Sequence, residues 1–145
     1  MKNLFWIGTL LICILTTACG NDKKISTIGG AASINVTEKG ETMMYEQITA
    51  EDAKKIMDSG EKFILLDTRE QEEFDDEHIP GAILIPYTEI TSKAEKMIPD
   101  KSQLILVYCR SGRRSKIASE SLAMLGYINV KEFGGIIDWP YETEK

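Results

Sequence analysis

One cysteine stands among arginines in this sequence, a combination suited to nucleophilic attack on an anion. Cys109 ends an apolar run, and three of the chain's four arginines, Arg110, Arg113 and Arg114, follow it within five residues. The formal net charge of the whole chain is -6, so a basic site around a cysteine is a local exception. This exception favours a small anionic substrate, whereas the overall charge disfavours nucleic acid as a partner.

The expected position of this cysteine between two elements would also activate its thiol. The run 104–108 predicts a buried strand, and a helix is expected to begin near Gly112. Backbone N–H groups in the connecting loop and at the helix N-terminus would bind an anion and lower the thiol pKa, and Gly112 permits backbone angles that a side chain would forbid. We therefore interpret Cys109 as a nucleophile; the alternative is a buried structural cysteine.

The elements that would position this loop alternate between strand and helix. Thr49 is expected to cap the first helix and Gly60 to end it. The order predicts an α/β fold in which about five mainly parallel strands form a sheet with helices on both faces. The expected strands are 47–49, 63–66, 82–85, 104–108 and 129–130, and the expected helices are 50–59, 70–75, 90–98, 112–125 and a final one after Gly135.

Apolar residues at helical spacing predict which side chains the helices turn toward the core. Four groups follow this pattern. They are Ala53, Ile56 and Met57; Ile90, Ala94, Met97 and Ile98; Ile117, Ala118, Leu122 and Leu125; and Trp139 with Ile136 and Ile137.

Three motifs, in order along the chain, resemble the signatures of the rhodanese family. The segment Cys109–Arg114 reads Cys-Arg-Ser-Gly-Arg-Arg and resembles the active-site loop of single-domain rhodaneses, Cys-x-x-Gly-x-Arg. Leu66–Glu70 followed by His78–Ala82 resembles the first signature of the family, and Phe133–Ile136 with Trp139 resembles the last.

The resemblance covers about 45–141 and implies a sulfurtransferase. Cys109 would attack the sulfane sulfur of thiosulfate or a related donor, sulfite would leave, and cyanide or another thiophile would take the sulfur from the persulfide. Arg110 would attract the donor, and the sequence leaves open which of the two later arginines points inward. No cofactor and no metal are expected. The implied substrate-binding residues are Arg110, Ser111, Gly112, Arg113 and Arg114.

Other polar residues in these motifs are expected to support the site. Asp67 and Arg69 would form a buried or semi-buried pair that fixes a strand end, with Arg69 also a candidate to reach the active site. His78, the only histidine, is expected to have a structural role, since the loop activates the thiol without a general base. The acidic run 72–77 is interpreted as a solvated helix face and not as a metal site.

The first residues predict a bacterial lipoprotein signal peptide. Lys2 precedes the uncharged run 4–15, which is shorter than the roughly 20 apolar residues that span a bilayer. The run ends in Leu-Thr-Thr-Ala-Cys-Gly, which resembles a lipobox, although Thr16 occupies the usual leucine position. We expect a signal peptide at 1–18, a lipidated Cys19 and flexible tether at 19–44, and the rhodanese domain at 45–145.

Lipidation of Cys19 would hold the domain outside the cytoplasm, on the bacterial cell membrane or outer membrane. Ordinary signal cleavage with a free Cys19 is the alternative, and an uncleaved anchor is a further one. Because Cys13 would leave with the signal, Cys109 would be the only thiol of the domain. That arrangement excludes internal disulfides and counts against a thioredoxin-like role.

Two other functions remain alternatives to small-molecule sulfur transfer. A persulfide carrier or docking module would deliver sulfur to a protein thiol with the same chemistry at Cys109. Cysteine phosphatases and arsenate reductases use a loop one residue longer, Cys-x5-Arg. Ser115 occupies the position of that arginine, and Tyr108 occupies the place of the histidine usual in phosphatases, so this second alternative is disfavoured.

Overall fold

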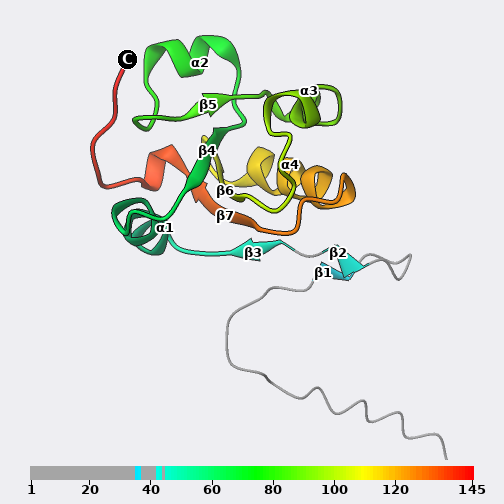
Figure 1. Cartoon of the computed structure of the whole chain (residues 1–145). Coiled ribbons are helices and arrows are strands. Elements are labelled where there is room, and N and C mark those ends of the chain that lie inside the picture. Colours follow the sequence, from blue (N-terminus) through cyan, green and yellow to red (C-terminus); the bar gives the residue numbers. More distant parts are fainter. Residues whose placement is uncertain (1–34, 37–41, 44) are drawn as a thin grey trace, which may run out of the picture.

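The centre of the structure is a five-stranded, all-parallel sheet (Figure 1). The structure is a computed structural model that describes residues 35–36, 42–43 and 45–145. The strands lie side by side in the order β3, β7, β6, β4, β5, which confirms the predicted α/β class. Their bounds are Glu46–Gln47 for β3, Phe63–Asp67 for β4, Ile83–Leu84 for β5, Leu104–Cys109 for β6 and Val130–Gly135 for β7.

The central strand β6 is buried along its whole length. It pairs with β4 on one side, from Phe63 opposite Leu104 to Asp67 opposite Tyr108, and with β7 on the other side. A strand covered on both faces needs a continuous apolar sequence, which explains why this segment does not alternate with polar residues. Its carboxyl end is Cys109, beside which the pairing with β7 shifts register.

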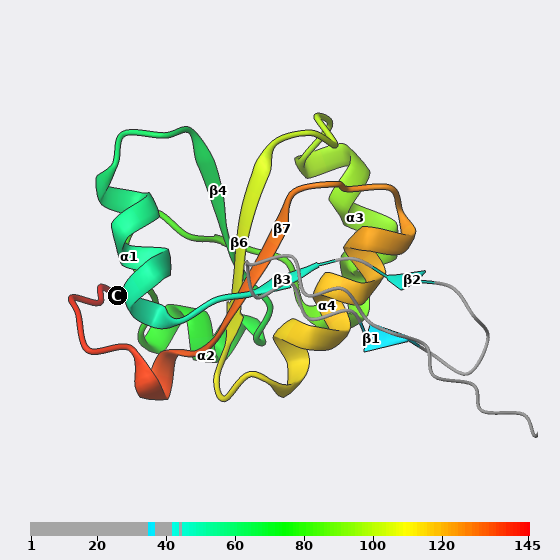
Figure 2. The same cartoon turned by 90° about the horizontal axis from the view of Figure 1, so that it is seen from below.

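Helices cover both faces of the sheet, as Figures 1 and 2 show. Helices α3 and α4 pack on one face over an apolar cluster that includes Ile90, Ala94, Ala118 and Leu122. On the other face, α1 packs over a second cluster with the segment around Trp139. The helices are α1 Ala50–Asp58, α2 Gln71–Asp76, α3 Ile90–Met97 and α4 Arg113–Met124, with 3₁₀ turns η1 Tyr87–Glu89 and η2 Ile136–Asp138.

The predicted ends of α1 are confirmed. The Thr49 side chain accepts a hydrogen bond of 3.1 Å from the backbone N–H of Asp52, which satisfies one of the free donors of the first turn. Ser59 is the C-cap, and Gly60 follows in the left-handed region with φ +82°. These local signals lie next to one another in sequence, so they are readable without knowledge of the fold.

The C-terminal part of the domain differs from the prediction. Strand β7 has six residues where 129–130 was expected, and a single turn, η2, replaces the predicted final helix. The strand is longer because its residues continue to pair with β6 as far as Gly135. After that turn, Trp139 is buried as expected, whereas Ile137 is 62% exposed and does not belong to the core.

Two further core predictions were wrong. Met97 is 43% exposed because it ends α3 at the border of the face that carries Ile90 and Ala94. Ile117 is 39% exposed because α4 turns Ser115, Ala118, Ser119 and Leu122 toward the sheet instead. The two serines are small enough for close packing, so the buried face of this helix is less apolar than its spacing suggested.

The segment expected to be a tether contains a short antiparallel pair, β1 Asn35–Val36 with β2 Thr42–Met43. The predicted signal peptide and Cys19 fall within 1–34, outside the described residues, and stay predictions. Within the ranges that the structure does describe, no helix is long and apolar enough to cross a membrane.

Candidate active site

Cys109 lies at the carboxyl end of β6, directly before the loop that leads into α4, as the sequence predicts. Its side chain is almost fully buried, with 1% exposure. The backbone N–H of Gly112 donates a hydrogen bond to Sγ at 3.1 Å, and the hydroxyl of Ser115 lies 3.5 Å from the same atom. The loop therefore turns its donors inward onto a single sulfur atom.

The loop depends on close contact with the glycines that end β7. Gly112 has φ +93°, and a Cβ built on it would lie 3.5 Å from Cα of Gly134. A Cβ on Gly135 would lie only 2.1 Å from the carbonyl oxygen of Arg110. The glycine pair of the last motif thus has a physical reason: it lets the strand and the cysteine loop approach backbone to backbone.

The surroundings of Cys109 favour its thiolate. Burial acts to raise the pKa of the thiol, but the Ser115 hydroxyl and the backbone N–H groups of Ser115, Ser111 and Gly112 act in the opposite direction. The hydrogen bonds prevail, and the pKa of Cys109 lies below the ordinary thiol value. The site thus favours the thiolate without an adjacent histidine.

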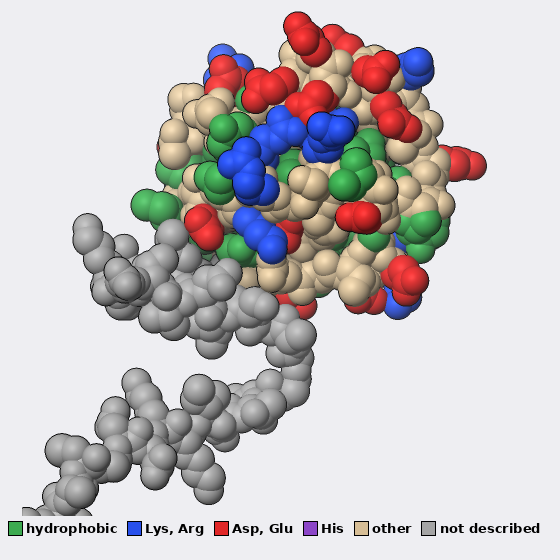
Figure 3. All heavy atoms as spheres, turned by 180° about the vertical axis from the view of Figure 1, so that it is seen from behind, with side chains coloured by type: hydrophobic (Ala, Val, Ile, Leu, Met, Phe, Trp, Pro, Cys, Tyr) green, Lys and Arg blue, Asp and Glu red, His purple; other side chains and the backbone are tan. Residues whose placement is uncertain are grey.

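The arginines of the loop have different environments. Arg114 is partly buried and forms two hydrogen bonds to the carboxylate of Glu73 in α2, at 2.6 and 2.7 Å. This pairing with Arg114 lowers the pKa of Glu73 to about 2. Arg110 and Arg113 are exposed, so their charges remain available to solvent anions. Figure 3 shows basic side chains gathered on one face of the molecule with carboxylates near them.

Asp67 and Arg69 form the expected buried pair beside the cysteine strand. The guanidinium of Arg69 donates to both carboxylate oxygens of Asp67, with a shortest distance of 2.6 Å, and also to the carbonyl of Glu77. Thr68 adds a hydrogen bond to the carbonyl of Tyr108 at 2.9 Å. The pair fixes the end of β4 next to the end of β6.

A pocket of about 440 Å³ opens beside the loop, and Arg69 and Arg110 both line it. Arg69 therefore lies next to the cysteine loop, a position that would allow it to reach the region of the active site. The other residues around this pocket are Glu73, Asp76, Glu77, Ile136 and Ile137.

His78 lies among structural contacts. Its Nδ1 is 2.9 Å from the carbonyl oxygen of Phe74, its ring stacks on the Phe74 ring, and its backbone pairs with Glu144. These contacts tie α2 to the C-terminal segment, in agreement with the structural role predicted for His78.

Two residues around Cys109 are not among the site residues that the sequence predicts. The sequence distinguishes Ser115 only by its spacing from the cysteine, and it does not distinguish Glu132. Both are buried, and the Ser115 hydroxyl donates to the Glu132 carboxylate at 2.7 Å. The sequence signal for Glu132 is its charge in a segment that forms a buried strand, two places before Gly134. Charged residues are almost never fully buried unless they are paired, so such a residue marks a candidate site.

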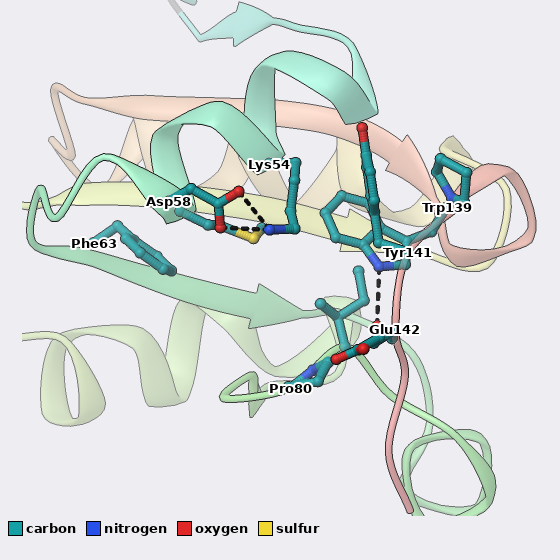
Figure 4. Close-up of a pocket in the computed structure, with 10 residues that line it drawn as sticks. Lys54, Asp58, Phe63, Pro80, Trp139, Tyr141 and Glu142 are labelled. Atoms are coloured by element: carbon teal, nitrogen blue, oxygen red, sulfur yellow. Dashed lines mark hydrogen bonds and ion pairs between the residues drawn. The ribbon is translucent and has the colours of Figure 1, made fainter.

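A second pocket, of about 760 Å³, lies between α1, the start of β4 and the C-terminal segment (Figure 4). Lys54 and Asp58 form an ion pair on its α1 side, and the Trp139 indole N–H donates to the Glu142 carbonyl at 3.2 Å. Phe63, which begins β4, contributes to the lining, whereas Cys109 lies at the far end of the sheet. This pocket is therefore separate from the candidate active site.

Comparison with known proteins agrees with the loop and sheet geometry. The sequence model of the rhodanese-like domain family matches residues 49–140 of this chain. The chain belongs to the rhodanese-like family. It is 40% identical over 73 residues to the thiosulfate sulfurtransferase PspE of Escherichia coli, a match covering 50% of this chain and 70% of PspE. It is also 33% identical over 105 residues to the adenylyltransferase and sulfurtransferase UBA4 of Candida albicans, but spans only 24% of that protein.

Solved rhodanese-like structures share the fold. A rhodanese with anions from E. coli is 36% identical with a TM-score of 0.55, over 58% of this chain and 99% of that one. The rhodanese-like domain of the Alr3790 protein from Anabaena is 30% identical with a TM-score of 0.64, over 70% and 80% of the two chains. The chain is thus a rhodanese-like protein of a sulfurtransferase family, with Cys109 as its candidate nucleophile.

Proposed function

We propose that this chain transfers sulfane sulfur from thiosulfate or a related anionic donor through a persulfide on Cys109. The observation that carries the proposal is the convergence of the Gly112 N–H and the Ser115 hydroxyl on Sγ of Cys109. Donors aimed at one atom suit a thiolate and the single sulfur it would carry. Membership of the rhodanese-like family supports the same reaction class.

The reaction would proceed in two covalent steps. The Cys109 thiolate attacks the outer sulfur of thiosulfate, a new S–S bond forms, and sulfite leaves with the electron pair of the broken S–S bond. Cyanide or another thiophile then attacks the outer sulfur of the persulfide, and the bonding pair returns to Sγ. Exposed Arg110 and Arg113 would attract the dianionic donor to the loop in an otherwise acidic protein.

The test is the intact mass of the full chain after exposure to thiosulfate. We expect one added sulfur atom on the wild type and none on Cys109→Ser, which should also lose thiocyanate formation from thiosulfate and cyanide. Circular dichroism would establish that the variant is folded. Thiocyanate production by the folded serine variant would contradict the proposal, as would faster cleavage of p-nitrophenyl phosphate than sulfur transfer by the wild type.

Delivery of sulfur to a protein thiol is a second candidate function. The observation in its favour is the exposed side chain of Ile137, whose backbone N–H donates to the carbonyl of Arg110 at 3.2 Å. An apolar side chain beside the loop suits contact with a macromolecule better than contact with cyanide. An Ile137→Ser variant that slows transfer to a protein thiol, and leaves transfer to cyanide unchanged, would support the carrier function.

We also propose that residues 1–18 are a signal peptide and that a lipidated Cys19 anchors the domain 45–145 outside the bacterial cytoplasm. The support is the short apolar run before a Thr-Thr-Ala-Cys sequence. The partners would then be the membrane, through the lipid, and a sulfur donor and acceptor of the cell envelope.

A further inference from the structure

The buried hydroxyl of Ser115 lies between the thiol of Cys109 and the buried carboxylate of Glu132. The Ser115 Oγ atom is 3.5 Å from Cys109 Sγ and 2.7 Å from Glu132 Oε1. Ser115 has no solvent exposure, and Glu132 has 2%. The three side chains come from β6, α4 and β7, and they form a continuous hydrogen-bonded path from the thiol into the interior.

Glu132 has hydrogen-bond donors around it but no ion pair. Its Oε1 accepts from the backbone N–H of Gly134 at 2.9 Å, and its Oε2 accepts from the amide of Gln47 in β3 at 3.2 Å. None of the ion pairs between residues that the structure describes involves this carboxylate. Asp67, the other buried carboxylate near the loop, differs because Arg69 neutralises it.

The charged groups nearby already have partners. From α4, Arg114 is held by Glu73, and on the β3 side Glu46 pairs with Lys131 of β7. Cys109 is the titratable group that faces Glu132 from β6, with Ser115 between them. Because Glu132 has no ion pair among the described residues, it can accept a proton from Ser115 without giving up a cationic partner.

The hydroxyl proton of Ser115 has more acceptors than it can satisfy. Besides Glu132 at 2.7 Å, Gly112 O lies at 3.0 Å, Gly134 O at 3.3 Å and Cys109 Sγ at 3.5 Å. A serine hydroxyl carries one proton and two lone pairs. When it donates to the nearest acceptor, Glu132, a lone pair is free to accept from the thiol of Cys109.

We propose that Glu132 takes up the proton of Cys109 through Ser115 when the nucleophile forms. The S–H proton moves to Ser115 Oγ as the hydroxyl proton moves to Glu132 Oε1, which leaves a thiolate and a neutral carboxylic acid. The group keeps one negative charge throughout. A thiolate beside a charged carboxylate would carry two, and would repel a dianionic donor more strongly.

The remaining steps of sulfur transfer then follow without loss of that proton to solvent. The thiolate takes the outer sulfur of the donor, and sulfite leaves with the electron pair of the broken bond. When an acceptor removes this sulfur, the pair of the Sγ–S bond returns to Cys109, and the proton can return from Glu132 through Ser115. Glu132 touches no reacting atom and is a positioning residue that acts through Ser115.

The test is the pH dependence of Cys109 alkylation by iodoacetamide in the full chain, measured by mass on the peptide that carries Cys109. Two groups that share one proton titrate as a coupled pair. Over about pH 4 to pH 10, the wild type should therefore show two steps separated by a plateau. Glu132→Gln and Ser115→Ala should each show one step, and at about pH 5 both should react roughly tenfold more slowly than the wild type.

The number of steps in the wild type separates a relay from a simple field effect, because a fixed carboxylate charge would shift a single step and would not add a second one. Ser115→Ala leaves the carboxylate near the thiol, so its single step should lie at higher pH than that of Glu132→Gln. Glu46→Gln is the matched control, because it removes the same charge from the neighbouring strand and should keep the wild-type profile. Ser115→Thr retains a hydroxyl and should keep both steps.

The relay would be overturned by a single step in the wild type, a result that needs no variant to fold. It would also be overturned by two steps in Glu132→Gln, or by equal midpoints in Glu132→Gln and Ser115→Ala. The inference rests on the proposed role of Cys109 in sulfur transfer. Because alkylation reads the thiol itself, failure of the relay would leave sulfur transfer intact, and failure of sulfur transfer would show separately in the mass measurement with Cys109→Ser.

Discussion

Cys109 is nearly buried, and the same backbone that buries it also provides the donors that favour its thiolate. A thiol in an apolar core would remain protonated and inert. Here the backbone N–H groups of the loop replace the lost water, so burial and activation occur together. Activation of the thiol therefore depends on the geometry of the loop.

Charge at Arg110 should affect donor capture more than turnover. We expect Arg110→Ala to raise the KM for thiosulfate about five- to tenfold with a smaller change in kcat, since an exposed charge mainly attracts the anion. Added salt should raise the KM of the wild type and affect the variant less, because exposed charges are screened beyond about 8–10 Å at moderate ionic strength. Steady-state kinetics at two salt concentrations measures both effects.

Lys116→Ala is the matched control for Arg110→Ala, because Lys116 is also basic and exposed but lies inside α4. It should change the KM by less than about twofold. An unchanged KM and salt response in Arg110→Ala would show that the backbone N–H groups alone bind the donor.

The Glu73–Arg114 pair should make the free energy of unfolding depend on pH in the acidic range. The pKa of Glu73 falls from 4.5 to about 2 in the folded protein, so the pair contributes stability that is present above pH 4.5 and lost as the pH falls toward 2. We expect Glu73→Gln to lower the free energy of unfolding by about 1 kcal/mol at neutral pH, a modest value because the pair is partly exposed. The difference from the wild type should shrink as the pH falls through about 4.5 toward about 2, which urea unfolding can measure.

Glu72→Gln controls for the charge of the first turn of α2, which both residues share. Glu72 is exposed, and its substitution should change the unfolding free energy by less than about 0.5 kcal/mol. A loss in Glu73→Gln that stays constant with pH would contradict the assignment to the ion pair.

At the scale of elements, the end of β7 decides whether the cysteine loop can close. The Arg110 carbonyl lies where a Cβ of residue 135 would be, and the backbone of Ile137 donates to this same carbonyl. A strand that follows the whole of α4 in sequence thereby limits the shape of the loop that precedes this helix. The loop and the glycine pair are therefore parts of one structure.

Gly135→Ala should damage both stability and sulfur transfer. The added methyl group would meet backbone atoms at 2.1 to 2.5 Å, and backbone cannot move aside as a flexible side chain can. We expect a loss of about 2–3 kcal/mol in unfolding free energy. Displacement of the loop should reduce sulfur transfer at least about tenfold, because positional errors near 1 Å can cost about 10²-fold.

Gly60→Ala serves as the control for Gly135→Ala. Gly60 has φ +82°, and there is open space where the methyl group of an alanine would lie. Gly60→Ala therefore introduces backbone strain alone, which should lower the free energy of unfolding by about 1 kcal/mol. The variant should retain full sulfur transfer. If the two variants were equally stable and equally active, the close approach at Gly135 would not govern the loop.

At the scale of the whole molecule, an acidic chain carries a small basic site. The net charge is -6, while the exposed Arg110 and Arg113 lie next to the buried nucleophile. A local positive site concentrates small anions, whereas the surrounding negative charge opposes association with polyanions. This distribution suits the small anionic donor proposed above.

The anchor proposal has its own test. We expect Cys19→Ala to yield unlipidated precursor or soluble protein in place of a membrane-associated form, because no other residue at that site can carry the thioether. Detergent phase partitioning of expressed wild type and variant measures the change, with Cys109→Ser as a control that keeps Cys19. Normal partitioning of Cys19→Ala into the detergent phase would show that the apolar segment itself is the anchor.

Features whose signals lie in neighbouring residues could be predicted from the amino-acid sequence. A continuous apolar strand, a cysteine, a glycine and a helix follow one another within 104–125, so the place of the loop and its inward-facing N–H groups could be predicted from neighbouring residues. The Thr49 cap and the burial of the Asp67–Arg69 pair were predictable for the same reason, since each involves residues at most three apart.

Contacts between distant segments could not be predicted in this way, because they depend on how the elements pack together. Packing of the elements places the Glu132 carboxylate within hydrogen-bonding distance of Ser115, and it pairs Arg114 with Glu73 of α2, 41 residues earlier. It also leaves the side chains of Ile117 and Ile137 exposed. Helical spacing and strand composition describe one element at a time. Which residues meet across elements depends on the register of β7 against β6 and on the rotation of α4 over the sheet, and these are set by packing of the whole core.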